Sequence, residues 1–191
     1  MIISEIFKNR LKSLAGIKNT IQEAKNHKNE YGCLMLEIKY EGWDDILKII
    51  DKDDLYTAEE GFGLEKNPHV TILFGFHDNA DIDKIKNLTK EHCSEPVEIL
   101  LKNITMFENV ENKYDVLKFD VKCPKLNELN KVMTDNFDYT SDFPDYHPHT
   151  TIAYVKTGTG KKYVSKKEDL SVLCDNFFYS TKDNKTTYFK I

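Results

Sequence analysis

Two short segments of this chain carry the same residue types at the same spacing. His69–Ile72 reads His-Val-Thr-Ile and His149–Ile152 reads His-Thr-Thr-Ile, and Pro68 and Pro148 precede them. In an extended strand, residues i and i+2 lie on one face, so each segment would present an imidazole beside a hydroxyl. Two imidazoles around one phosphate can act as base and acid in a single displacement, while two hydroxyls hold the phosphate oxygens. The candidate catalytic residues are therefore His69, Thr71, His149 and Thr151, with the choice of base and acid left open.

Strands must position both pairs, and the apolar runs of the two segments predict strands over Val70–Phe76 and Thr150–Val155. The acidic, glycine-containing stretch 51–67 predicts a loop. The order of elements predicts an α+β fold within residues 29–191. It would have two similar lobes, each an antiparallel sheet with helices outside, and the two sheets would face a central cleft. The other predicted elements are helices over Trp43–Ile50, Ile82–His92 and Lys125–Phe137, strands over Tyr31–Tyr40, Val97–Phe107 and Tyr114–Val121, and a hairpin of Phe177–Lys182 and Lys185–Ile191 that turns at Asp183 and Asn184.

Residues 1–28 predict one amphipathic helix, because apolar side chains recur at helical spacing from Ile3 to Ala24. Its expected role is to pack on the domain or on a second copy of the chain, which would make a homo-oligomer. This N-terminus lacks the apolar core of a secretory signal, and no run is long enough to cross a membrane. The four cysteines are widely separated and form no C-x-x-C motif. We therefore expect a cytoplasmic protein with reduced, mostly buried thiols and no membrane contact.

The charge balance limits the partners of this chain. Lysine and arginine together number 27 against 32 acidic residues, the formal net charge is −5, and Arg10 is the only arginine. A long nucleic acid is not an expected partner, because binding it depends on neutralising many phosphates. A small substrate with few phosphates fits this composition. A third match to the pattern, His92–Ser94, ends a predicted helix and is interpreted as a chance match without a catalytic role.

Two other kinds of site have weaker patterns. His147 and His149 could chelate a metal together with His69 or His77, but no carboxylate or cysteine joins them at a telling spacing. The glycine- and lysine-containing stretch 157–162 lacks both the first glycine and the final hydroxyl residue of a phosphate-binding P-loop. This stretch therefore predicts a turn, and the chain is expected to need neither a metal nor a cofactor.

At its two motifs the chain resembles the two-histidine phosphoesterase superfamily, which has the LigT-like fold. That family is marked by two H-x-[ST]-x segments with apolar flanks, one in each lobe of a pseudo-symmetric α+β domain, and the separation of His69 and His149 suits it. The wider segment Gly63–Asp78 is similar to the phage anti-CBASS nucleases, which destroy cyclic oligonucleotide messengers of bacterial defence. The resemblance implies a metal-independent phosphodiesterase that cleaves cyclic di- or trinucleotides by 2′-hydroxyl attack, in the cytoplasm of an infected host.

Two tyrosines are candidate substrate-binding residues. Tyr31 best matches a substrate-contacting tyrosine of the family, and Tyr146 is the aromatic loop residue best placed to stack on a base. The acidic residue that the family uses near its C-terminus has no match, because no glutamate follows Glu168. Two alternatives stay open: an enzyme that processes RNA ends at 2′,3′-cyclic phosphates or 2′-5′ linkages, and a sponge that sequesters cyclic nucleotides uncut. The paired histidines argue against the sponge, since sequestration needs no proton transfer.

Overall fold

The computed structural model describes residues 31–58, 61–107, 113–141, 145–166 and 169–191, so the predicted N-terminal helix lies outside the described residues. The strands are β1 (Gly32–Glu37), β2 (His69–Phe76), β3 (Val97–Phe107), β4 (Tyr114–Lys122), β5 (His149–Lys156), β6 (Leu170–Cys174), β7 (Asn176–Ser180) and β8 (Thr186–Lys190). The α-helices are α2 (Trp43–Leu47), α3 (Ile82–His92) and α4 (Pro124–Asn136), and the 3-10 turns are η1 (Lys52–Asp54) and η2 (Gly160–Tyr163).

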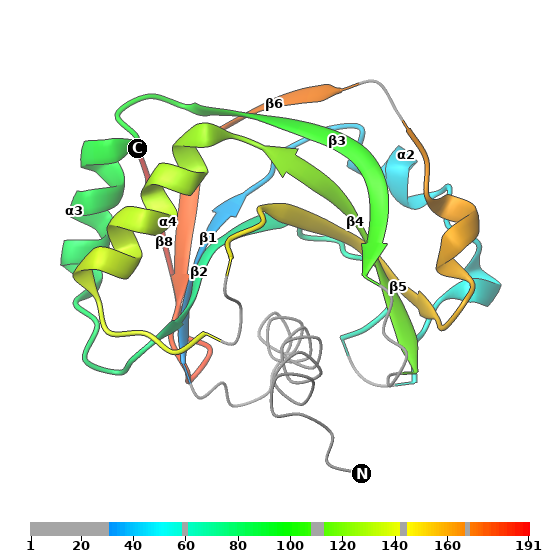
Figure 1. The fold of residues 1–191 in the computed structure, drawn as a ribbon, viewed down its shortest axis with the longest axis horizontal. Coiled ribbons are helices and arrows are strands. Elements are labelled where there is room, and N and C mark those ends of the chain that lie inside the picture. The colour runs from blue at the N-terminus through cyan, green and yellow to red at the C-terminus, as the bar shows by residue number, and fades with distance from the viewer. Residues whose placement is uncertain (1–30, 59–60, 108–112, 142–144, 167–168) are drawn as a thin grey trace, which may run out of the picture.

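The strands form two four-stranded antiparallel sheets. Their orders are β2-β1-β7-β8 and β5-β4-β3-β6, so each motif strand is an edge strand of its own sheet. The edge strands β2 and β5 lie side by side where the two sheets meet (Figure 1). The predicted α+β class with two antiparallel sheets is confirmed. The C-terminal hairpin β7–β8 completes the first sheet by pairing with β1, so the two ends of the described chain share one lobe.

The helices cover the sheets on the side away from the motif side chains. Figure 1 shows α3 and α4 together beside the sheet of β1, β2 and β8. Asn130 of α4 donates from Nδ2 to the Ile72 carbonyl at 2.8 Å, which ties this helix to β2. In the second lobe, Trp43 of α2 packs against Phe119 of β4 with ring centroids 6.2 Å apart. The apolar helical side chains that are fully buried are Ile85, Leu126, Leu129 and Met133.

Both motif strands carry the same irregularity. The register with the neighbouring strand shifts by one residue at Ile72 in β2 and at Ile152 in β5, directly after the motif threonine. Such a bulge bends a strand and increases its local twist. In β2 it returns Phe74 to the partly exposed face that carries His69 and Thr71. The two lobes therefore share the edge position of the strand that carries the motif and also the shape of that strand.

Most predicted elements are confirmed, and the differences lie in β1, α2, β6 and the loop. α3 and β3 have the predicted bounds, whereas β1 and α2 are shorter than predicted. The predicted loop 51–67 contains η1 and also bridges β5 at Leu55 and Leu64, because the free edge of β5 offers backbone groups that this segment satisfies. β6 has no counterpart among the predicted strands. It is an outer strand of five residues whose alternate side chains are exposed, so its apolar pattern is short.

One glycine of β2 is required by a close backbone approach. Gly75 has φ of +103°, and a Cβ there would lie 1.9 Å from the Thr140 carbonyl oxygen. We expect Gly75→Ala to lower the free energy of unfolding by about 3 kcal/mol through strain and clash, measured by urea denaturation. Gly158→Ala is the matched control, because Gly158 has φ of +84° but no atom within 4 Å of the added Cβ. Equal losses in the two variants would show that the clash with Thr140 contributes nothing.

Candidate active site

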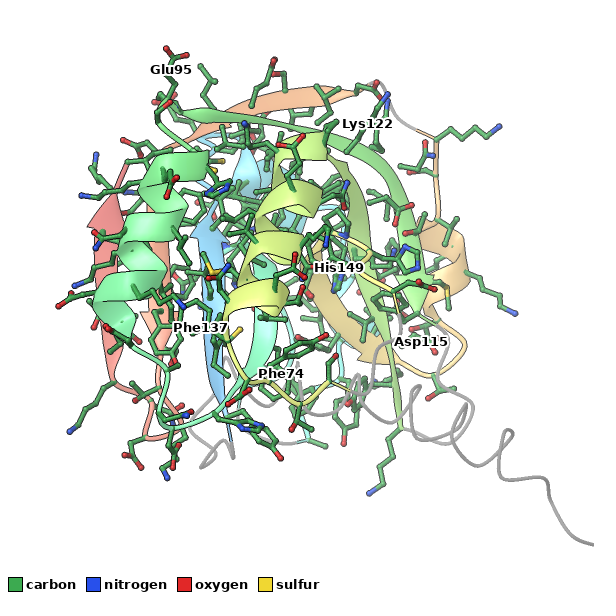
Figure 2. The ribbon with its side chains drawn as sticks, turned by 60° about the vertical axis from the view of Figure 1, so that its left-hand side comes forward. Phe74, Glu95, Asp115, Lys122, Phe137 and His149 are labelled. Atoms are coloured by element: carbon green, nitrogen blue, oxygen red, sulfur yellow. The ribbon has the colours of Figure 1, made fainter. Side chains whose placement is uncertain are left out.

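The two motifs place their imidazole and hydroxyl groups on one face, as predicted from the strand period. In each motif the histidine and threonine are partly exposed, whereas the residue between them and the following isoleucine are fully buried. The partly exposed residues are His69, Thr71, His149 and Thr151, and the fully buried ones are Val70, Ile72, Thr150 and Ile152. Figure 2 labels His149 at the start of β5 and Phe74, which continues the corresponding face of β2.

Both imidazoles are oriented by the same backbone contact. Nδ1 of His69 lies 2.9 Å from the Asn67 carbonyl oxygen, and Nδ1 of His149 lies 2.9 Å from the His147 carbonyl oxygen. A carbonyl oxygen only accepts, so Nδ1 carries the proton in each ring and Nε2 is the nitrogen left to exchange protons with a substrate. Each ring also meets a phenylalanine edge-on: Phe178 of β7 at 5.9 Å from His69, and Phe107 of β3 at 5.1 Å from His149.

The two histidines lie on strands that contact each other, and their charges are coupled. Burial lowers the pKa of His149 from 6.5 to about 4, the His147 carbonyl opposes this shift, and the charges of Lys118 and His69 lower the pKa further. β2 and β5 contact each other, and each motif histidine lies on the partly exposed face of its strand, so the two imidazoles are candidates for a shared site. The lowered pKa keeps His149 neutral at neutral pH, which is the state that a base requires.

The same pKa predicts how stability depends on pH. The unfolded chain binds a proton at His149 with a pKa near 6.5, and the folded chain binds it only at about 4. The contribution of His149 to the free energy of unfolding is therefore fully present above pH 6.5. It is lost as the pH drops towards 4, because the unfolded state takes up the proton first. We expect His149→Asn to flatten this part of the profile of urea midpoint against pH. An unchanged slope in His149→Asn would contradict the shift.

The model of the 2′-5′ RNA ligase superfamily matches residues 58–183, a segment that contains both motifs. The chain belongs to the 2′-5′ RNA ligase superfamily. These are two-histidine, LigT-like phosphoesterases, and a phosphodiesterase is consistent with both the family and the geometry. No curated protein among those compared matches the chain by sequence.

Solved structures share the fold at low sequence identity. Kluyveromyces marxianus Usb1 is 11% identical with a TM-score of 0.57, over 85% of this chain and 98% of that one. The same protein with uridine monophosphate is 10% identical with a TM-score of 0.54, over 86% and 99%. E. coli LigT with 3′-AMP is 16% identical with a TM-score of 0.49, over 85% and 95%. The Usb1 matches show that this member of the 2′-5′ RNA ligase superfamily shares the fold of Usb1.

Charged and polar residues that the motifs do not reveal surround the two histidines. Glu37 of β1 is paired with His69 in the sheet, and Asp120 of β4 is paired with His149. Glu37 accepts from Asn176 Nδ2 at 2.5 Å, and Asp120 accepts from Thr105 Oγ1 at 3.0 Å. These residues lie far from the motifs along the chain. The sequence signal that could have indicated them was a charged residue within an otherwise apolar strand, as at Lys118 and Asp120.

Tyr31 lies next to the extension of the first motif. Its ring meets Phe74 edge-on with centroids 5.9 Å apart and stacks on His77 with centroids 5.7 Å apart. Phe74 shares the partly exposed face of His69 and Thr71, so Tyr31 continues the aromatic lining of that face. This position is compatible with a contact to a base, and the substrate-binding role stays a prediction.

Tyr146 joins the two motif segments. Its hydroxyl donates to the Thr71 carbonyl at 2.9 Å, and burial raises its pKa, so the hydroxyl stays a donor. We expect Tyr146→Phe to lower the free energy of unfolding by about 1 kcal/mol, because one half-buried hydrogen bond is lost. If the ring also stacks on substrate, as predicted, Tyr146→Leu should raise KM well above that of Tyr146→Phe. Equal KM values would assign Tyr146 to positioning alone.

In the described part of the chain, residues of the alternative sites have other partners. No group of three histidine, cysteine, aspartate or glutamate side chains gathers there as a metal site. His77 Nε2 instead pairs with Thr140 Oγ1 at 2.9 Å, and His92 Nδ1 with the Leu88 carbonyl at 2.9 Å. The P-loop-like stretch leads into η2, where Lys162 pairs with Asp54 at 2.5 Å. The four cysteines are buried and unbridged, as predicted, and no described helix is long and apolar enough to span a membrane.

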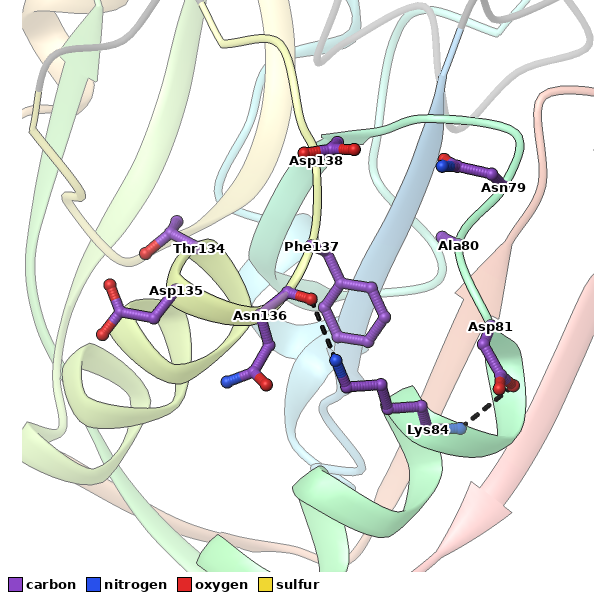
Figure 3. Close-up of a pocket in the computed structure, with 9 residues that line it drawn as sticks. All are labelled: Asn79, Ala80, Asp81, Lys84, Thr134, Asp135, Asn136, Phe137 and Asp138. Carbon is purple, nitrogen blue, oxygen red and sulfur yellow. Dashed lines mark hydrogen bonds between the residues drawn. The ribbon is translucent and has the colours of Figure 1, made fainter.

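A surface recess lies away from the histidines. It has a volume of about 410 Å³ and lies between the start of α3 and the end of α4 (Figure 3). Lys84 crosses it, donating from Nζ to the Asn136 carbonyl at 3.1 Å and lying 4.9 Å from the Phe137 ring centroid. The backbone N–H of Lys84 donates to Asp81 Oδ1 at 3.2 Å. These groups satisfy one another, and no histidine lines the recess, so the paired motifs remain the candidate active site.

Proposed function

We propose that this chain is a phosphodiesterase that cleaves the 3′-5′ bonds of cyclic di- or trinucleotides, and that it thereby removes the messengers of bacterial CBASS defence. One observation carries the proposal: two His–Thr pairs lie on the partly exposed faces of edge strands that contact each other, with both Nε2 atoms left to exchange protons. Sequestration alone requires no such pair of proton-transfer groups.

His149 takes the role of base and His69 the role of acid. His149 is neutral at neutral pH, so its Nε2 accepts the proton of the ribose 2′-hydroxyl. The 2′-oxygen then forms a bond to phosphorus, and the bond from phosphorus to the 5′-oxygen breaks. Protonated His69 gives its Nε2 proton to that leaving oxygen. The product is an opened chain with a 2′,3′-cyclic phosphate at one end and a 5′-hydroxyl at the other.

The hydroxyls of Thr71 and Thr151 donate to the non-bridging phosphate oxygens. Negative charge develops on these oxygens as the fifth bond to phosphorus forms, and preorganised donors stabilise it most effectively. Both hydroxyls lie two residues from their histidine on the same strand face, so one phosphate can contact both members of a pair. His69 and His149 supply both proton transfers of this reaction.

Three features support a small cyclic substrate. The net charge of −5 disfavours a long polyanion, because an excess of acidic residues repels it and leaves few cations to neutralise its phosphates. Tyr31 and Phe74 offer an aromatic surface beside the first pair for a base. The segment Gly63–Asp78 also resembles the anti-CBASS nucleases.

RNA-end processing is the second candidate function. The family model carries the name 2′-5′ RNA ligase, and one structural neighbour is described with uridine monophosphate. The same two histidines would then act on a 2′-5′ linkage or open a terminal 2′,3′-cyclic phosphate. The alternative differs in substrate and not in catalytic residues.

A substrate screen in EDTA-containing buffer tests the proposal. Cyclic dinucleotides, cyclic trinucleotides, a 2′-5′-linked dinucleotide and a short RNA with a 2′,3′-cyclic phosphate are incubated with the protein and separated by chromatography. We expect opened cyclic nucleotides with 2′,3′-cyclic phosphate ends. Cleavage of the two RNA substrates alone would establish the second candidate, and recovery of bound, intact cyclic nucleotide after denaturation would establish a sponge.

A further inference from the structure

Lys118 is a cation buried on the face of the second motif. It belongs to β4 and is paired with Thr151 of β5, and cross-strand partners project their side chains to the same side of a sheet. Its side chain is only 9% exposed. A lysine is rarely buried to this extent, because removing its charge from water is costly unless an anion compensates for it.

The ammonium group of Lys118 is held in place by three contacts. Nζ donates to Thr105 Oγ1 at 2.8 Å and also to Asp120 Oδ1. It lies 4.4 Å from the centroid of the Phe107 ring, the ring that meets His149 edge-on. An ammonium group has three N–H donors, and these hydrogen bonds use two of them. Among the described residues the third N–H has no hydrogen-bond acceptor, and Lys118 shares the sheet face of Thr151.

The other lobe shows that the fold does not require a charge at this position. The residue paired with Thr71 is Met35, which is also buried. Methionine and lysine have similar lengths, and methionine packs without a desolvation penalty. The lobe that carries His149 thus keeps a buried cation where the equivalent position of the first lobe holds a neutral thioether.

We propose that Lys118 is a substrate-binding residue whose ammonium contacts a non-bridging oxygen of the phosphate held by Thr151. The inference rests on the proposed function in that it uses the same site, and it adds a cation to the two histidines and two threonines. Asp120 holds Lys118 in place and partly neutralises its charge in the absence of an anionic ligand. The site is therefore asymmetric, with the fixed positive charge on the side of His149.

Binding of inorganic phosphate, measured by isothermal titration calorimetry at about pH 8, tests this role. At that pH histidines are neutral and lysines are charged, so the contribution of Lys118 is isolated. We expect Lys118→Met to weaken phosphate binding about ten- to a hundredfold, because a hydrogen bond to a charged group is lost. Lys118→Arg should retain most of the affinity. Lys122→Met is the matched control on the same strand and should bind phosphate as the wild type does.

Asp120→Asn gives an effect of opposite sign that structural damage would not produce. Neutralising this carboxylate leaves the charge of Lys118 uncompensated, so we expect phosphate to bind several-fold more tightly. Unaltered binding in Lys118→Met, weaker binding in Asp120→Asn, or no phosphate binding by the wild type would each overturn the inference. Thermal unfolding of all variants confirms that they are folded. Phosphate binding through Lys118 in a protein that opens no cyclic nucleotide would reject the proposed substrate and keep this inference.

Discussion

Replacing either His69 or His149 with alanine is expected to lower kcat by about 10²–10⁴-fold, because each imidazole carries one proton transfer of the displacement. The two losses should be of similar size, since the 2′-hydroxyl is a poor nucleophile without a base and the 5′-oxygen a poor leaving group without an acid. The measurement is initial rates of cyclic dinucleotide opening in EDTA-containing buffer, with circular dichroism to confirm the fold.

His92→Ala is the matched control for both variants. His92 ends α3, and its Nδ1 pairs with the Leu88 carbonyl of the same helix, outside the site. Its rates should equal those of the wild type. Full activity in His69→Ala or His149→Ala would remove that residue from the mechanism. Loss of wild-type activity on chelation would instead indicate an enzyme that depends on a metal.

Thr71→Val should lower kcat by about 10²–10³-fold, the effect of removing one well-placed donor to developing negative charge. Valine has nearly the shape of threonine and keeps the strand and the packing of Ile72 intact. The loss should appear mainly in kcat and less in KM, because the contact strengthens as charge develops. Thr151→Val should act similarly, and it also removes the contact between Thr151 and the Tyr154 hydroxyl.

Thr150→Val is the control for Thr71→Val, because it makes the same substitution at a threonine whose hydroxyl does not face the site. Thr150 is fully buried between His149 and Thr151, and its hydroxyl has no hydrogen-bond partner. Replacing an unsatisfied buried hydroxyl with a methyl group should leave the rate unchanged and stability equal or higher. A rate loss in Thr150→Val as large as that in Thr71→Val would show that the threonines support the strand and do not contact phosphate.

Local patterns were sufficient for most of the secondary structure. The bounds of α3 and β3 follow from helical and strand periods that operate between near neighbours in the chain. The shared face of His69 and Thr71 follows from the same strand geometry. β6 was not predicted, because an edge strand of five residues buries few side chains and its apolar alternation is too short to recognise.

Pairing between distant segments decided the composition of the site. Asp120 faces His149 and Glu37 faces His69 only because β4 pairs with β5 and β1 with β2 in one particular register. A shift of one residue would turn each carboxylate to the opposite face. Tyr146 shows the same dependence, since its hydroxyl reaches the carbonyl of Thr71 across the two lobes.

The amino-acid sequence by itself determined the two imidazole–hydroxyl pairs and the α+β class, because both depend on the period of the backbone, which is local. Tertiary structure alone decided that Lys118 lies buried beside Thr151, that burial lowers the pKa of His149 and that β2 and β5 are neighbours. These properties depend on burial and on strand register, and both arise from contacts between residues that are far apart in the chain.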